Sequence, residues 1–205
     1  MNMGPDAAPS KRRYRMTARA QAAAATRARI LDAATALFWE HPMLDMSLED
    51  VARRAGVSLP TVIRHVGDKE GLFAAGAERE SARVNHQRNE APVGDVPAAV
   101  RILFDHYEEL GDAVLRLLAD EDRVPGLRGL ADRGRATHAQ WCERVFAPVL
   151  TDLSGDERAR RLAEFIALTD VFVWKLLRRD RQLSRSEAEL AMCEMIEPLM
   201  GRGEM

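Results

Sequence analysis

The segment from Ser47 to Leu72, SLEDVARRAGVSLPTVIRHVGDKEGL, constrains the fold of this chain more than any other stretch. It reads as two short helices joined by a tight turn, followed by the start of a third helix. Gly56 falls where the end of a helix favours a left-handed backbone. A second helix that begins almost immediately afterwards must cross the first one sharply. This pattern is typical of a helix-turn-helix, which places one helix in the major groove of DNA.

Each helix of this segment has a residue suited to its start. Ser47 is a favourable N-cap, and Asp50 can bond back to its amide in a weaker form of the capping box. Ser58 and Asp68 are expected to cap the second and third helices. Pro60 falls in a first helical turn, where its missing N–H costs nothing. These local signals agree with one another, and such agreement favours a single folded structure.

The second helix of the motif has two different faces. Val62 and Val66 share one face and are predicted to point inward. The other face mixes apolar, hydroxyl and basic side chains, which suit thymine methyl groups, base edges and phosphates. A generic packing unit that touches no DNA is the alternative interpretation. The predicted DNA-binding residues are Ser47, Ser58, Leu59, Pro60, Thr61, Arg64, His65 and Lys69.

The stretch before the motif, RILDAATALFWE at residues 29–40, has one apolar face and predicts a supporting helix. Together the two stretches resemble the N-terminal domain of the TetR (tetracycline-repressor-like) family. Two positions depart from the pattern of that family, because Ile63 replaces its usual tyrosine and Val66 its usual phenylalanine. The resemblance rests on Arg27, Ile30, Leu31, Ala33, Ala34, Leu37, Phe38, Ser47, Val51, Ala52, Ala55, Gly56, Val57, Ser58, Thr61, Val62, His65, Lys69, Glu70 and Leu72.

The distribution of charge agrees with a DNA-binding N-terminus. The formal net charge is −2, yet residues 1–30 hold 7 Lys or Arg against 1 Asp or Glu. Cations concentrated in this way suit binding to phosphates by counterion release. We expect residues 1–25 to form a flexible basic arm, residues 26–72 the helix-turn-helix domain and residues 73–205 a helical ligand-binding and dimerisation domain. A disordered terminus without a role is the alternative for the arm.

Every periodic pattern beyond the motif is helical, which predicts an all-α protein with an N-terminal head and a C-terminal helical body. The turn formers of NEAPVGDVP, at residues 89–97, predict the boundary between head and body. Ser184 and Glu187 form a full capping box that opens the last helix. Further helices are expected near residues 68–85, 97–110, 112–121, 130–150 and 154–181.

The last two expected helices are apolar on nearly every side. An apolar surface of this width indicates a partner, and two helices from each of two copies would form an intermolecular four-helix bundle. The family resemblance implies the same homodimer. Burial of both faces inside one chain is the alternative. The candidate interface residues are Phe165, Phe172, Leu176, Met192, Met195 and Leu199.

The family resemblance also implies that the body encloses a pocket for a small-molecule effector. For each candidate lining residue, a position in the core or on the surface is the more common interpretation. The candidates are Phe104, His106, Tyr107, His138, Trp141, Asp170 and Trp174.

Several classes of protein lack their usual sequence signals here. There is no glycine-rich phosphate loop, nucleophile elbow or metal-ligand spacing, so we expect no catalytic residues, no cofactor and no metal site. Cys142 and Cys193 are read as buried residues in a reducing cytoplasm. No apolar run is long enough for a membrane span or signal peptide, so we expect a cytoplasmic protein without membrane partners.

These observations favour one function and leave one alternative. The leading hypothesis is a homodimeric DNA-binding transcriptional regulator, a repressor that a small-molecule effector releases from a pseudopalindromic operator in double-stranded DNA. The alternative is a helical small-molecule-binding dimer that has lost DNA binding, which Ile63 and Val66 favour.

Overall fold

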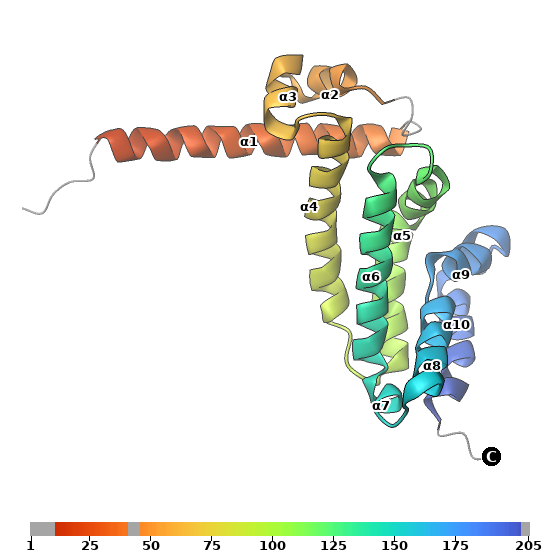
Figure 1. Ribbon diagram of the computed structural model, residues 1–205. Helices are drawn as coiled ribbons and strands as arrows, with labels where there is room; N and C mark the ends of the chain where they lie inside the picture. Colours follow the sequence, from red (N-terminus) through yellow and green to blue (C-terminus); the bar gives the residue numbers. More distant parts are fainter. Residues whose placement is uncertain (1–10, 41–45, 202–205) are drawn as a thin grey trace, which may run out of the picture. The chain divides into compact units, whose positions relative to one another are not determined.

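The computed structural model describes residues 11–40 and 46–201, and every regular element within these ranges is helical (Figure 1). The prediction of an all-α protein is therefore confirmed. The chain divides into two compact units, with the boundary between Gly76 and Ala77. We call the first unit the head and the second the body. This boundary lies inside helix α4 (Lys69–Asn89), so one continuous helix begins in the head and ends in the body.

The head contains α1 (Lys11–Glu40), α2 (Leu48–Ala55), α3 (Leu59–Val66) and the start of α4. Apolar side chains from all four helices form its core, because each helix contributes residues at helical spacing to one buried face. The large apolar side chains buried in the head include Ile30, Leu31, Leu37, Met46, Val51, Val62 and Leu72.

Helix α1 is longer than the sequence predicted. Residues 11–25, expected as part of a flexible arm, are helical, whereas residues 1–10 of that arm lie outside the described part of the chain. This correction has a simple cause, because the run AQAAAA at residues 20–25 consists almost wholly of alanine, the residue with the highest helix propensity. The side chains of residues 17–25 are exposed, so this part of α1 has no apolar face whose spacing would have predicted a helix.

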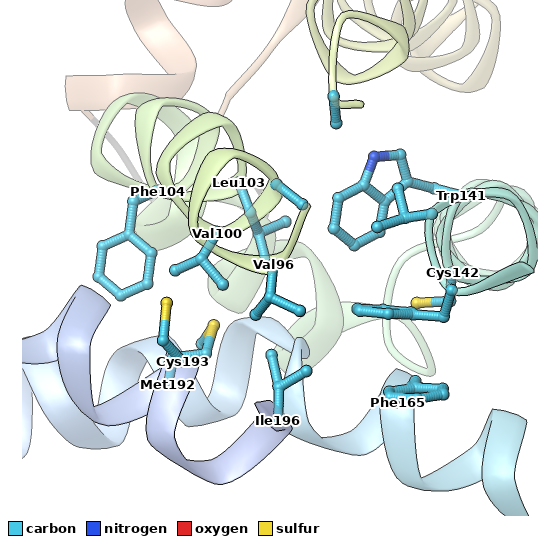
Figure 2. Close-up of a cluster of buried hydrophobic side chains, with 14 of the residues drawn as sticks. Val96, Val100, Leu103, Phe104, Trp141, Cys142, Phe165, Met192, Cys193 and Ile196 are labelled. Atoms are coloured by element: carbon cyan, nitrogen blue, oxygen red, sulfur yellow. The ribbon is translucent and has the colours of Figure 1, made fainter. Parts of the chain in front are cut away.

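The body is built around α5 (Val96–Asp120), which packs against helices on several sides. Figure 2 shows its side chains meeting those of α6 (Leu127–Val145) and α10 (Arg185–Met200), with Phe165 of α8 (Gly155–Leu168) closing the core from below. The short helices α7 (Ala147–Leu150) and α9 (Val171–Lys175) connect these elements, and a π-helical turn η1 (Leu176–Asp180) extends α9. Fully buried members of this core include Leu103, Phe104, Val145, Phe146, Phe165, Trp174, Met192 and Ile196.

Three boundaries predicted in the body are wrong. Gly111 does not divide the segment 97–121, because α5 continues through it and an added Cβ would lie only 2.5 Å from the Trp174 ring. The expected helix at 154–181 breaks at Thr169, and the Asp170 carboxylate caps α9 by accepting from the amide of Phe172 (2.9 Å). The loop before α5 lies inside the body, since the amide of Gly94 donates to the carbonyl of Val145 (2.8 Å).

Helix length and hydropathy also bear on membranes. Within residues 11–40 and 46–201, none of the helices combines the length and the apolar character that a membrane span requires.

Candidate nucleic-acid interface

Local hydrogen bonds fix both ends of α2, the helix that leads into the turn before α3. Ser47 caps α2 through a complete capping box, in which the amide of Asp50 donates to the Ser47 hydroxyl (3.1 Å) and the amide of Ser47 donates to the Asp50 carboxylate (3.3 Å). The hydrogen bonds from Ser47 lower the pKa of Asp50. At the other end, Gly56 adopts φ 65°, and the amide of Val57 donates to the carbonyl of Ala52 (3.0 Å). These bonds hold the start of α3 in one orientation relative to α2.

Helix α3 presents a face that the head does not cover. Val62 is fully buried and anchors α3 to the core, whereas Arg64 is exposed and Ile63 is 47% exposed. The Ser58 hydroxyl bonds to the Thr61 hydroxyl (2.9 Å) and makes no capping bond to the helix backbone. Ser58 therefore occupies the predicted N-cap position without acting as a side-chain cap.

The arginines of the head differ in how their charges are balanced. Arg53 pairs with Asp50 (2.9 Å), and Arg54 pairs with Glu40 at the end of α1. Arg64 has no ion-pair partner among the residues that the structure describes, and its side chain extends from α3 into solvent. The guanidinium of Arg64 is thus the cation of α3 that remains available to an external anion.

The start of α4 adjoins this face along the chain. The Asp68 carboxylate accepts from the amide of Gly71 (2.8 Å) and so caps the helix, as predicted. The ammonium group of Lys69 lies 5.8 Å from the centre of the Phe73 ring. Lys69 is the first residue of α4, and the N-terminal end of a helix attracts phosphate.

The structure places the predicted DNA-binding residues on three adjoining segments of the head, namely the start of α2, helix α3 and the start of α4. Pro60, Ser58 and Arg64 are exposed, and Leu59, Thr61, His65, Lys69 and Ser47 are half-buried. Ile63 was noted from its sequence only as a departure from the family pattern. Its exposure adds an apolar side chain to this face, and the position of Ile63 next to the inward Val62 could have revealed it.

The predicted effector-binding residues lie in the body, where most of them are buried. Tyr107, His138, Trp141 and Thr169 meet around the end of α4: the Tyr107 hydroxyl donates to the Thr169 carbonyl (2.9 Å), and the Trp141 indole donates to the Arg88 carbonyl (3.1 Å). Phe104 belongs to the apolar core, and Trp174 donates to the Glu108 carboxylate (3.0 Å). Asp170 serves as the cap of α9.

Burial keeps the titratable groups of this cluster neutral. It lowers the pKa of His106 and of His138 to about 3, and it raises the pKa of Tyr107 to about 12 and that of Cys142 to about 11. Arg88, which is only 5% exposed, is a cation within this neutral cluster. The sequence did not identify Arg88, because a charged residue in a helix is normally solvated and nothing in the local pattern indicated its burial.

The predicted dimer residues separate into two groups. Phe165 and Met192 are fully buried in the core of their own chain, so they are not available to a partner. In contrast Phe172, Leu176 and Met195 are 56%, 49% and 37% exposed, and Leu199 is half-buried. The structure adds Leu190, which is 59% exposed. We call Phe172, Leu176, Leu190 and Met195 the C-terminal apolar surface.

The head therefore has the fold of a helix-turn-helix unit with one exposed, partly basic helix, which is typical of DNA-binding transcription regulators. Residues 30–75 match the model of the family described as "Bacterial regulatory proteins, tetR family". The matched stretch runs from the buried half of α1 to the first turns of α4 and contains the whole motif. The predicted resemblance to the N-terminal domain of the TetR family is thus confirmed over this stretch of the chain.

Solved structures extend the likeness in fold to both units. The chain is similar to a protein assigned to the TetR family of transcriptional regulators from Mesorhizobium loti, with 22% identity and a TM-score of 0.62 over 87% of this chain and 96% of that one. It is also similar to a TetR-family protein from Rhodococcus sp., with 20% identity and a TM-score of 0.61 over 86% of this chain and 99% of that one. A comparison of the sequence with curated proteins found no significant match.

Proposed function

We propose that this regulator is a homodimeric repressor that binds a pseudopalindromic operator and is released from it by a small-molecule effector. The exposed face of α3 is the observation that carries the DNA-binding part of this proposal. On that face Arg64 has no ion-pair partner among the described residues, while Val62 fixes the helix to the core. Rigid presentation of an unpaired arginine suits recognition of guanine edges or phosphates.

The C-terminal apolar surface supports the homodimer. Large apolar side chains that remain exposed on two neighbouring helices typically mark an interaction surface. A twofold-symmetric pair would present two copies of α3, and each copy would read one half of a palindrome. We propose that Phe172 and Leu176 lie at the centre of this interface.

The effector would act through the body. A ligand releases DNA only if it binds one conformation of the body more tightly than the DNA-binding one, and a tenfold loss of DNA affinity needs about 1.4 kcal/mol of such preference. The residues proposed to surround it are Phe104, Tyr107, His138, Trp141, Asp170 and Trp174.

Selection from a random duplex library, followed by anisotropy titration of the selected site, tests the DNA-binding proposal. We expect an inverted repeat, and we expect the affinity to fall steeply with salt. The Arg64→Ala variant should bind the site about 5- to 150-fold more weakly and with less sequence preference, since one base contact contributes roughly 1–3 kcal/mol. The Arg160→Ala variant is the control, because it removes the same charge from α8 of the body.

The outcomes of this experiment are distinct. If wild type and Arg64→Ala bind the site equally, α3 is not the reading helix. If no duplex is selected and binding shows no dependence on salt, the alternative holds, namely a small-molecule-binding protein that has lost DNA binding. The exposed Ile63 favours this alternative, because it stands where the family usually has a hydroxyl-bearing tyrosine.

Sedimentation velocity tests the dimer separately. We expect Phe172→Glu and Leu176→Glu to convert a dimer into a monomer, because each would bury an unpaired charge at the interface. Val93→Glu is the matched control, since Val93 is equally exposed (54%) but lies on the loop before α5. A wild-type monomer at micromolar concentration contradicts the proposal.

A further inference from the structure

Arg88, in the last turn of α4, is a buried cation whose charge no carboxylate balances. Its side chain is 5% exposed, and no Asp or Glu among the described residues lies within ion-pair distance of it. Other arginines of the body pair directly, as in Arg83 with Glu109 (2.8 Å) and Arg179 with Asp112 (3.0 Å). Because burial of an unpaired charge is costly, the exception needs an explanation.

The present partners of Arg88 are neutral and distant. One guanidinium nitrogen lies 3.3 Å from Nδ1 of His138 and another lies 3.4 Å from the Tyr107 hydroxyl, whereas Nε has no partner. A charge-assisted hydrogen bond from arginine is normally about 2.7–2.9 Å long. These contacts are therefore weak, and a carboxylate could replace them with a net gain.

A second cation lies close to Arg88, and the carboxylate of Asp170, whose charge acts on Tyr107 and Cys142 of this cluster, forms no ion pair with Arg88. The guanidinium of Arg144 donates to the carbonyls of Ala91 (2.8 Å) and Arg88 (2.9 Å), and its Nε also lacks a partner. Nearby Asp170 is occupied as the cap of α9, where it accepts from the amide of Phe172. The partial negative charge at the end of α4 is about half a unit and is shared with the donors from Trp141 and Arg144.

Other groups around Arg88 define the shape of its missing partner. The guanidinium carbon of Arg88 lies 5.6 Å and 5.2 Å from the centres of the Tyr107 and Trp141 rings, so an aromatic ligand paired with Arg88 would meet two aromatic side chains. His106, next to Tyr107, is 7% exposed, and its Nδ1 has no hydrogen-bond partner. That nitrogen is a further unused polar atom at the same place.

We infer that the body binds an aromatic monocarboxylate whose carboxylate pairs with Arg88 and whose ring packs against Trp141 and Tyr107. This inference rests on the proposed function and deepens it, since it names the chemical class of the effector. A bidentate pair with Arg88 supplies the charge that the interior lacks, and the planar guanidinium matches the geometry of a carboxylate.

Thermal unfolding of the free, full-length protein with benzoate or phenylacetate tests this inference at constant ionic strength. The neutral amides benzamide and phenylacetamide are the matched ligands. We expect a carboxylate at about 100 times its Kd to raise the melting temperature by roughly 5–10 °C, and the matched amide to leave it unchanged. Equal shifts with carboxylate and amide, or no shift with either carboxylate, overturn the inference.

Two variants assign any shift to Arg88. Arg88→Met removes the charge, keeps the volume and should abolish the difference between carboxylate and amide, whereas Arg128→Met on the surface of α6 should retain it. Should Arg88→Met not fold, Arg88→Lys keeps the charge without the planar fork, and we expect benzoate to bind it at least about tenfold more weakly. Unchanged benzoate affinity in the folded variant overturns the inference. Because no DNA is present, failure here leaves the DNA-binding proposal standing, and failure of DNA binding leaves this one standing.

Discussion

Replacement of Gly111 by alanine tests the packing of the body most directly. A Cβ at this position would lie 2.5, 2.7 and 2.9 Å from three atoms of the Trp174 ring, all closer than real Cβ contacts allow. The ring has little freedom to move, because it is fully buried, its indole donates to Glu108 and the Arg179 guanidinium lies 4.4 Å from its centre. Overpacking of this kind costs about 1–3 kcal/mol, whereas alanine gains about 1 kcal/mol of helix propensity. We expect a net loss of up to about 2 kcal/mol in the free energy of unfolding.

Urea unfolding followed by tryptophan fluorescence measures this loss through the transition midpoint. Gly134→Ala in α6 is the control of opposite sign, since nothing beyond its chain neighbours and its own helix backbone lies within 4 Å of an added Cβ there. That variant should be more stable by up to about 1 kcal/mol. If Gly111→Ala is as stable as Gly134→Ala, the close approach between α5 and Trp174 does not exist and the reasoning is refuted.

Three further predictions follow from burial and capping. Burial lowers the pKa of His106 and of His138 to about 3, so below about pH 6.5 the unfolded chain binds protons that the folded chain does not. The free energy of unfolding should therefore fall as the pH drops below about 6.5, by up to about 1.4 kcal/mol per pH unit for each histidine. Unfolding titrations of His106→Gln should give a shallower pH slope, and an unchanged slope would contradict burial of a neutral ring. The thiol of Cys142, whose pKa burial raises to about 11, should react with iodoacetamide only after unfolding, which mass spectrometry of the native protein checks. Ser47→Ala removes a complete capping box and should cost about 1 kcal/mol in urea unfolding; a cost near zero would mean that α2 starts elsewhere.

The head could be predicted because its structure is encoded locally. The capping box of Ser47, the left-handed Gly56 and the inward Val62 depend on neighbours only a few residues away, and each occurs where the pattern placed it. The extent of α1 was missed for the opposite reason. Its alanine run has helix propensity but no amphipathic face, so hydrophobic periodicity gave no signal there.

The body was harder to predict because its decisive features are contacts between distant segments. Gly111 reads as a helix breaker until Trp174 occupies the space beside it. At the break between α8 and α9, the buried Thr169 hydroxyl lies 3.1 Å from Nε2 of His138, a partner on another helix. Burial of Arg88 likewise depends on aromatic rings from α5 and α6, which the sequence places far away.

The inward and outward faces of the apolar C-terminal helices were also not predictable from the sequence. Composition indicated that these helices have more apolar surface than one face requires, but it could not say which residues face inward. Phe165 and Met192 proved to be core residues, and Leu190, which was not among the candidates, is exposed. Only the packing of α10 against α5 and α8 separates these sets.

The stacking of Trp141 beside Arg88 gives the body a built-in optical reporter. An indole that is 4% exposed emits at short wavelength, and its emission intensity depends on the charge that lies 5.2 Å from the ring. Neutralisation of that charge by an incoming anion would change the brightness of Trp141 without any label. With Trp39 and Trp174 replaced by phenylalanine, a single chromophore would let binding in the body be followed in real time on the millisecond scale.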